Sequence, residues 1–356
     1  MDDFLIIGGG IAGVSAGARL AEFGRVTLLE AETALAYHAS GRSAALYVHE
    51  HGPHATVALA RASKDDFLSA EGWLSPRGVM FIAGAGEEET LARNIADYRL
   101  TPISVDEARQ KVPVLDPARV VAAGWDEEAW DIDTDRMIQS YARAVRANGQ
   151  IVTGAKVEKI RRTAQGWQVE AGGATHEARV LVNAAGAWAD AVARMAGLAP
   201  IGLVPKRRSI ARVAAPEGFD PSPWPMTFGA GESWYMKPDA GALLISPADA
   251  EPTTPHDAWA DDMVLAEGIA RWEDRVTTPV TRMIANWAGL RTFAPDGNVV
   301  LGPAPQDDAF VWCAGQGGFG FLTAPGASRL VADRVTGRQS ALDARTLSET
   351  DPARFA

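Results

Sequence analysis

The chain has 356 residues, 47% of them hydrophobic and 22% charged, which is typical of a globular protein of about two domains. Its formal net charge of −11 argues against nucleic acid or an anionic membrane surface as a partner. The only cysteine, Cys313, excludes an internal disulfide and any metal cluster held by several cysteines.

Residues 4–30 predict a strand, a tight turn, a helix and a second strand that ends in an acid. Gly8 permits the turn, Gly10 leaves room for a pyrophosphate near the backbone, and Gly13 lets the helix pack closely. Free N–H groups at the helix N-terminus favour phosphate, and Glu30 would accept hydrogen bonds from ribose hydroxyls. The pattern predicts a site for the ADP half of FAD or NAD; the alternative is a glycine-rich turn in an ordinary βαβ unit.

The next segments alternate between loop, helix and strand. Residues 37–44 form a loop rich in small and hydrogen-bonding side chains, 57–68 predict a helix, and 78–82 predict a strand.

Residues 131–149 predict a helix with a clear beginning and end. Asp131, Asp133 and Thr134 precede its apolar positions, and Gly149 ends the run. These acids and those at 126–128 could be taken for a metal site, but no histidine lies near them in sequence. Because acids at a helix N-terminus cap it and favour its dipole, we expect capping, a solvated face and no metal site.

The following stretch predicts short strands. Residues 156–160 and 167–170 bracket a turn, and an apolar run at 180–182 leads into small residues around Gly186, which let the backbone approach a ligand. From about residue 205 the chain predicts a hairpin at 233–237 and 242–245, a helix at 261–275 and a strand at 284–291.

A second glycine loop, Gly315 to Gly320, lies between a strand that reaches Ala314 and a helix. One pyrophosphate needs only one such loop, whereas an extended cofactor with a bulky ring at its far end can use both. Backbone N–H groups here could stabilise the electron-rich pyrimidine side of a reduced flavin. The second loop therefore favours FAD over NAD; the alternative is that it only permits tight packing of the helix on the strand.

Six motifs in this order resemble the FAD-dependent D-amino-acid oxidase-like family, and within it the D-arginine dehydrogenase-type enzymes. They are Gly8–Gly13 with Glu30, His38–Ser43, Val182–Trp188, Pro205–Ser209, Trp287–Arg291 and Gln316–Gly320. The resemblance spans nearly the whole chain. It implies an α/β fold, with a Rossmann-like FAD-binding domain of the glutathione-reductase type (1–75, 150–205 and 285–356) and an α+β substrate domain with an antiparallel sheet (76–149 and 206–284).

The resemblance also implies the residues that hold FAD. They are Gly8, Gly10, Ala12, Gly13, Glu30, Ala31, His38, Ala39, Ser40, Gly41, Arg42, Ser43, Ala44, Val157, Ala185, Gly186, Trp188, Gly289, Gly315, Gln316, Gly317, Gly318, Phe319 and Gly320.

The reaction of the family is oxidative deamination of an amino acid. A hydride passes from the α-carbon to flavin N5, and the imino acid hydrolyses to a 2-oxo acid and ammonia. The resemblance places Arg208 and Arg291 on the substrate carboxylate, because a guanidinium fits it bidentately, and Tyr235 beside them. Alternation along a strand predicts that Arg207 faces away from Arg208.

Gly317 and His51 complete the predicted catalytic site, with His51 at the substrate entrance. The alternative for His51 is an ordinary surface loop residue. A metal site made with His49 and His54 is not expected, because the spacing suits none and the flavin reaction needs none.

The sequence departs from D-arginine enzymes after Ser75-Pro76-Arg77, where Gly78 and Val79 replace an acid that would hold the cationic side chain. Without that acid a bound guanidinium would be left unpaired, at a cost of about a few kcal/mol. We therefore expect a neutral or apolar D-amino acid, including aromatic ones because Trp224 and Trp234 lie nearby in sequence.

Other functions of the same fold stay open. They are a glycine- or sarcosine-type amine oxidase, a 2-hydroxy-acid oxidoreductase and a non-catalytic flavoprotein, against which the anchors Arg208, Tyr235 and Arg291 argue. The electron acceptor is a quinone, another carrier or oxygen. No apolar run reaches about 18 residues and Met-Asp-Asp does not begin a signal peptide, so we expect no membrane span and a cytoplasmic protein.

Overall fold

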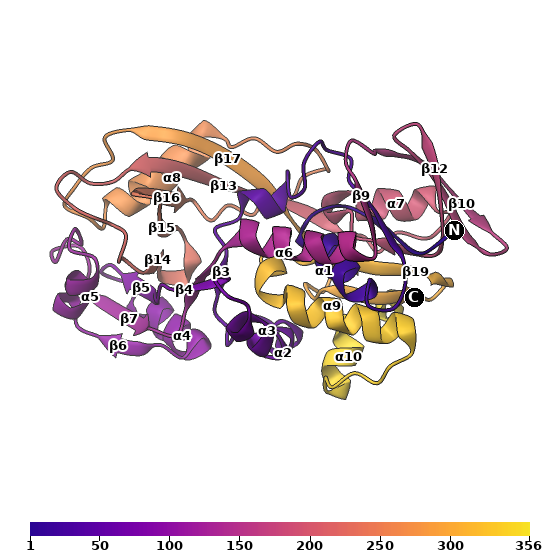
Figure 1. Cartoon of the computed structure of the whole chain (residues 1–356). Coiled ribbons are helices and arrows are strands. Elements are labelled where there is room, and N and C mark those ends of the chain that lie inside the picture. The colour runs from indigo at the N-terminus through magenta and orange to yellow at the C-terminus, as the bar shows by residue number, and fades with distance from the viewer.

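The computed structural model describes all residues from 1 to 356. Two eight-stranded sheets and a small three-stranded sheet form its framework. Figure 1 shows an elongated molecule in which the chain termini lie with β12, α9 and α10 in one half, and β5, β7 and β14–β16 lie in the other. The long strands β13 and β17 run between the two halves.

The first sheet has a parallel centre in the order β9-β2-β1-β12-β19. Its central strands are β1 (Asp2–Ile7), β2 (Val26–Leu29), β9 (Gly149–Val152), β12 (Ala174–Asn183) and β19 (Asp307–Ala314). The antiparallel strands β10 (Val157–Thr163), β11 (Gly166–Ala171) and β18 (Val300–Ala304) extend it. Parallel strands need crossover connections, and this explains why the strands come from three distant stretches of sequence.

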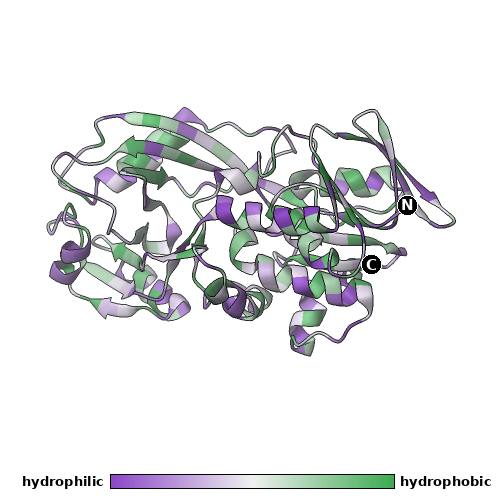
Figure 2. Ribbon diagram, in the orientation of Figure 1, coloured by the Kyte–Doolittle hydropathy of each residue, from purple (hydrophilic) through white to green (hydrophobic).

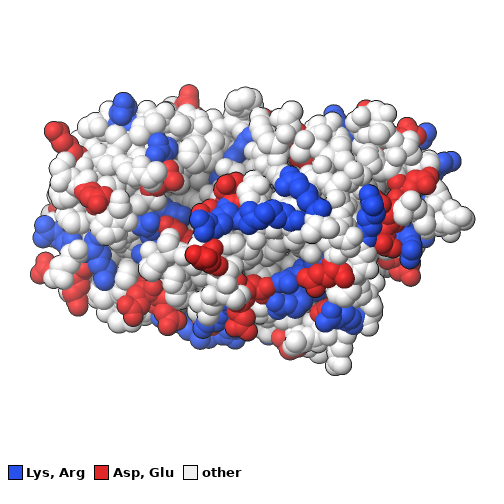
Figure 3. Space-filling model, viewed as in Figure 1, with Lys and Arg blue, Asp and Glu red and all other residues white.

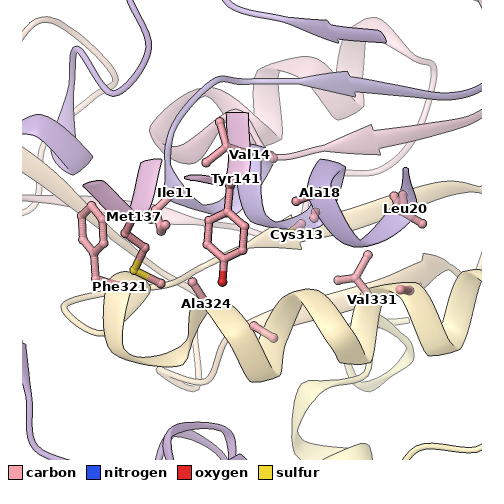
Figure 4. Close-up of a cluster of buried hydrophobic side chains, with 14 of the residues drawn as sticks. Ile11, Val14, Ala18, Leu20, Met137, Tyr141, Cys313, Phe321, Ala324 and Val331 are labelled. Carbon is pink, nitrogen blue, oxygen red and sulfur yellow. The ribbon is translucent and has the colours of Figure 1, made fainter. Parts of the chain in front are cut away.

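Three helices cover one face of this sheet: α1 (Ile11–Leu20), α6 (Thr134–Ala147) and α9 (Gly320–Thr336). Figure 4 shows how their apolar side chains meet: Ile11, Val14 and Ala18 of α1, Met137 and Tyr141 of α6, and Phe321, Ala324 and Val331 of α9. Burying one such aliphatic side chain stabilises the fold by about 1.5–3 kcal/mol. Cys313 packs in the same cluster, and burial raises the pKa of its thiol to about 12.

The second sheet has the order β17-β13-β16-β15-β14-β5-β7-β6. Its strands are β5 (Val79–Ala83), β6 (Thr101–Ile103), β7 (Ala122–Asp126), β13 (Val204–Ala214), β14 (Met226–Gly229), β15 (Tyr235–Asp239), β16 (Ala242–Ser246) and β17 (Met283–Phe293). The predicted hairpin is confirmed as β15 and β16. The prediction of an antiparallel sheet is wrong for one pair, since β14 and β5 run parallel. More than a hundred residues separate those strands, so the chain has ample length for a parallel connection.

The small third sheet lies between these two and contains β3 (Leu46–Tyr47), β4 (Leu74–Pro76) and β8 (Trp130–Ile132). The other helices are α2 (His54–Ala62), α3 (Lys64–Ser69), α4 (Glu88–Tyr98), α5 (Val105–Lys111), α7 (Ala189–Met195), α8 (Asp262–Glu273), α10 (Ala344–Thr350), η1 (Ala39–Arg42), η2 (Gly186–Trp188), η3 (Ala230–Glu232) and η4 (Pro352–Phe355).

Helix α6 begins as its sequence predicts. The Asp133 carboxylate accepts a hydrogen bond from the Arg136 N–H at 2.9 Å. This bond satisfies one of the N–H groups that the first turn leaves free. Asp133 therefore caps the helix, whereas Asp131 is largely buried and forms ion pairs with Arg77 and Lys237 at 2.6 and 2.8 Å.

Two elements decide where the boundary between the predicted domains should be drawn. Helix α6 packs on α1 in the first core, although the predicted boundary at 149 places it in the substrate domain. Strand β17 pairs with β13 of the second sheet, although the boundary at 285 places most of it with the FAD-binding domain. We propose that the boundaries lie near 133 and 294 instead.

The surface is mixed in polarity and charge. Figure 2 shows hydrophilic and hydrophobic residues alternating around the helices, as expected where one face packs on a core. Both signs of charge are interspersed over the face in Figure 3, with a short band of basic side chains across its middle. No helix has the length and apolarity needed to cross a membrane.

Candidate active site

A cavity of about 590 Å³ opens where β1, β2 and β12 end. Close backbone contacts shape its floor. Gly8 has a φ of +110°, and a Cβ there would lie 2.4 Å from the Ala184 carbonyl oxygen. A Cβ on Gly13 would lie 1.8 Å from the Gly8 carbonyl oxygen. Only glycine fits these two positions, so the first turn of α1 sits directly against the cavity, where its dipole favours phosphate.

The Glu30 carboxylate is buried at the edge of this cavity. One of its oxygens accepts from the Gly9 N–H at 2.6 Å and the other from the Glu32 N–H at 2.8 Å. Each oxygen has a second lone pair, so the fixed carboxylate can also accept from the hydroxyls of a ribose. This geometry fits the predicted role.

A second cavity of about 150 Å³ continues from the first. The two share the lining residues Gly10, Ala39, Ser40, Arg42, Ala184, Gly186, Gly289 and Leu290. Gln316, Gly317, Gly318 and Gly320 of the second glycine loop line the second cavity but not the first. Gly10 of the first glycine loop therefore borders both cavities, and the two joined cavities, together called the cleft, fit a cofactor longer than a single nucleotide.

Arg208, Tyr235 and Arg291 converge on the second cavity, and their polar groups are largely without protein partners. The buried Tyr235 hydroxyl has no hydrogen-bond partner. The Arg291 guanidinium makes no hydrogen bond or ion pair, and only Nε of Arg208 is engaged, donating to the Asp249 carbonyl at 2.7 Å. Buried polar groups are nearly always satisfied, so this set is suited to an external anion.

Strand register explains why the two arginines share a face. Arg208 of β13 lies opposite Gly289 of β17, and Lys206 lies opposite Arg291. Residues that pair across antiparallel strands point to the same face. Arg207 points elsewhere, because it forms ion pairs with Asp249 and Glu251 at 3.2 and 2.7 Å, and this confirms the predicted alternation.

The second cavity is electropositive. Burial and, second to it, the neighbouring charge of Arg208 together lower the pKa of Arg291 to about 10, against smaller opposing contributions from Tyr235, Glu232 and Asp249. The Arg291 guanidinium is therefore still charged at neutral pH. No aspartate, glutamate, lysine or histidine lines the second cavity.

Most of the residues predicted for the site line the two cavities. Those that do not are Gly13, Gly41, Gly315, Phe319 and His51. Gly13 and Gly41 are needed for packing, since a Cβ on Gly41 would lie 2.3 Å from the Ala36 carbonyl oxygen.

His51 does not line either cavity, although its ring centroid lies 6.1 Å from that of Phe319 in the second glycine loop. Its ring stacks on Tyr98 with the centroids 3.5 Å apart, and its Nε2 lies 3.6 Å from a carboxylate oxygen of Glu232. Burial lowers the pKa of His51, against the charges of Glu232 and Asp97. The structure therefore places this predicted catalytic residue outside the lining of the cleft.

The two tryptophans from which we expected an aromatic substrate, Trp224 and Trp234, also do not line the cleft. Trp224 and Trp234 are buried in the core on the other face of the second sheet, with Leu265 and Trp272 of α8. Trp234 precedes Tyr235, and adjacent strand residues point to opposite faces. The expectation that these rings lie near the substrate is therefore wrong. Val79 is fully buried among Val48 and other apolar residues.

The cleft also includes residues that the sequence did not single out. Leu46, Ile210, Thr292, Phe321 and Leu322 line the second cavity, and His256 and Ala258 line the first. The apolar members look like ordinary core residues in sequence. Only the tertiary arrangement distinguishes them from the rest of the core.

The fold and the cleft together define a flavin-dependent oxidoreductase, with a Rossmann-like sheet at the first cavity and a second sheet that carries the two arginines at the second cavity. The family described as FAD dependent oxidoreductase (DAO) matches residues 3–334. The chain therefore belongs to the DAO family of FAD-dependent oxidoreductases, as its motifs predicted.

Several proteins of known activity are similar to this chain. A glycine oxidase of Pseudomonas putida is 25% identical over 367 residues, covering 95% of this chain and 96% of that protein. A D-amino acid dehydrogenase of Rhizobium johnstonii is 41% identical, but over only 64 residues, which is 18% of this chain and 15% of that protein. The crystal structure of glycine oxidase from Geobacillus kaustophilus superposes with a TM-score of 0.82 at 24% identity, covering 96% of each chain.

Proposed function

We propose that this chain oxidises the α-carbon of a small, neutral D-amino acid, which then yields the 2-oxo acid and ammonia. The observation that carries the proposal is the convergence of Arg208, Arg291 and the unpartnered Tyr235 hydroxyl on the second cavity. Bound FAD would supply the chemistry by accepting a hydride.

The three polar side chains would hold the substrate carboxylate. Arg291 and Arg208 each offer N–H donors that the protein leaves free, and Tyr235 offers an O–H donor. Charge-assisted hydrogen bonds of this kind fix orientation as well as supplying affinity. Their common role is to hold the α-carbon in one place, which is the main contribution a protein makes when a cofactor performs the reaction.

The lining of the second cavity favours a neutral substrate that reacts with its amine unprotonated. It contains no carboxylate that could pair with a cationic side chain and no histidine, carboxylate or lysine that could take a proton. A buried unpaired cation would be costly. The amine would therefore lose its proton on the way in, and Leu46, Ile210 and Phe321 would exclude water around it.

The FAD contacts follow the two cavities. We propose that Gly8, Gly10 and Glu30 hold the ADP half and that Arg42 and Gly289 flank the middle. Gly317 and Gly318 would lie against the isoalloxazine ring. These residues line the two adjoining cavities, which share Gly10, Arg42 and Gly289.

A second candidate is oxidation of glycine or an N-alkylglycine such as sarcosine. The full-length similarity to glycine oxidases favours it. Such substrates present the same carboxylate to the same arginines, so the two candidates differ in the α-substituent and, for N-alkylglycines, in the substituent on the nitrogen.

Anaerobic spectroscopy of the purified, FAD-loaded protein separates these candidates. We expect flavin absorbance to bleach with D-alanine and not with L-alanine or D-lactate, and faster with D-alanine than with D-arginine. Bleaching by glycine and sarcosine but not by D-alanine would favour the second candidate. A flavin spectrum that no amine changes would contradict both, and repeating the reaction in air against an added dye would identify oxygen or a carrier as acceptor.

A further inference from the structure

The connection between β16 and α8 leaves the second sheet and crosses to the first cavity. We call its residues 249–258 the strap. The strap begins beside β13, where the Arg207 N–H donates to the Glu251 carbonyl at 3.0 Å and the Thr253 N–H donates to the Pro205 carbonyl at 2.9 Å. Its first residue, Asp249, accepts from the Ser209 N–H at 2.6 Å. This end of the strap is therefore an integral part of the sheet.

The other end of the strap is fastened to the loop before β3. One carboxylate oxygen of Asp257 accepts from Arg42 at 2.6 Å, and the other accepts from the Tyr37 hydroxyl at 3.3 Å. His38 Nδ1 lies 3.8 Å from the same carboxylate. Arg42 also donates to the carbonyl oxygens of Ala258 and Ala288 at 3.1 and 2.8 Å. A single carboxylate thus gathers three side chains from the other side of the cleft.

The strap forms part of the cavity wall. His256 and Ala258 line the first cavity, and Tyr37, His38 and Arg42 line it from the facing side. Asp257 lies between the two strap residues and bridges to that side. A cofactor in the cavity is therefore enclosed where the strap and the loop meet.

The bridge is ionised at neutral pH. Desolvation alone would raise the pKa of Asp257, but the hydrogen bond and charge of Arg42 outweigh it and lower the pKa. Asp257 is the only acid that pairs with Arg42. The Asp257 side chain is 38% exposed, so salt in the solvent can reach and weaken the pair.

We propose that the strap retains FAD in the cleft and that the Arg42–Asp257 pair is its latch. This inference rests on the proposed FAD site. FAD leaves when the strap parts from the loop at 37–42, and parting requires the bonds of Asp257 to break. Asp257 acts through Arg42 and the strap, so it is a positioning residue.

The test is the rate of FAD release from the full-length holoprotein, followed as the rise of free-FAD fluorescence after dilution. We expect release about 10-fold faster in Asp257→Ala, because a charge-assisted hydrogen bond is lost, and a smaller increase in Asp257→Asn. Glu251→Ala is the matched control, since this strap acid pairs with Arg207 away from the cavity, and its release rate should stay within about twofold of wild type.

Salt gives an independent measurement. Raising ionic strength from about 0.05 to about 0.5 M should accelerate release from the wild type more than from Asp257→Ala, which has no latch left to screen. If wild type and Asp257→Ala release FAD at the same rate and with the same salt dependence, the proposed role of the Arg42–Asp257 pair is wrong. It is also wrong if Glu251→Ala accelerates FAD release as much as Asp257→Ala does. If Asp257→Ala does not fold, Asp257→Asn decides the question. A wild type that binds no FAD would instead contradict the proposed FAD site.

Discussion

The dinucleotide end of the cleft is built mostly from backbone, whereas the substrate end is built from charged side chains on two long strands. Around Gly8 and Gly13 the chain leaves no room for a Cβ, and the ligand would meet N–H groups and a helix terminus. Around Arg208 and Arg291 the ligand would meet guanidinium groups that have few partners in the protein.

This difference predicts how the dinucleotide end and the substrate end of the cleft respond to amino-acid substitutions. A site built from backbone depends on a few glycine positions where any side chain would collide with the chain. Substituting one of these glycines should therefore impair folding and cofactor binding together. A side-chain site depends on groups whose removal leaves the backbone intact. Its failure should appear in substrate kinetics alone.

The largest effect is expected for Gly13→Ala. The new Cβ would lie 1.8 Å from the Gly8 carbonyl oxygen, so α1 must shift, at a cost of more than about 3 kcal/mol. We expect little or no flavin in the purified variant and a strongly lowered Tm. Gly154→Ala is the control: nothing lies within 4 Å of a Cβ there, so only its φ of +66° is strained and the loss should be about 1 kcal/mol. A Gly13→Ala protein with normal flavin content would refute the backbone description of this end.

The second-largest effect is expected for Arg291→Met, which should change substrate kinetics without changing cofactor binding or stability. Removing one charged anchor from a buried site costs about 3–4 kcal/mol, so kcat/KM should fall about 100- to 1000-fold while flavin content and Tm stay close to wild type. Arg212→Met, on the same strand as Arg208 but paired with Asp239, serves as control. Equal kinetics in wild type and Arg291→Met would mean that the anion-binding site lies elsewhere.

Tyr235→Phe removes one neutral donor from the same site. The hydroxyl is buried and has no protein partner, so the expected loss is that of one hydrogen bond to substrate, about 1 kcal/mol or about 5- to 10-fold in kcat/KM. Tyr47→Phe is matched in burial, but its hydroxyl donates to the Ala60 carbonyl at 3.0 Å outside the cleft. That variant should lose stability without a change in KM, and the reverse outcome would argue against the role of Tyr235.

The smallest effect is expected for His51, which does not line the cleft, and it is an effect on the pH dependence of stability. Burial lowers its pKa in the folded protein, so the unfolded chain binds the proton more readily. Stability is therefore fully present above the ordinary histidine pKa of about 6.5 and is lost as pH falls below it. His51→Phe keeps a ring against Tyr98 and removes this titration, so its Tm should fall less than that of wild type between about pH 7.5 and pH 5.5. An unchanged kcat/KM at neutral pH would show that His51 is not catalytic.

The sequence predicts the two ends unequally well, for physical reasons. Gly8, Gly13 and Glu30 belong to one continuous βαβ unit, so local spacing suffices to place them. Arg208 and Arg291 meet only because β13 and β17 pair in one particular register, which nothing local to either strand specifies, and the family resemblance was needed to link them. Trp234 was misplaced because its neighbour Tyr235 takes the opposite face. Asp257 carries no local signal, since it lies in a coil segment and acts on a residue 215 positions away.

The burial of Cys313 has a practical consequence. With its thiol pKa at about 12 and its side chain inside the core, this sulfur will not react with maleimide or iodoacetamide reagents while the protein is folded. The native chain is thus already a background-free host for chemical labelling. A cysteine introduced on the surface will carry a dye or spin label at one known position, and slow labelling of Cys313 itself will report how often the core opens.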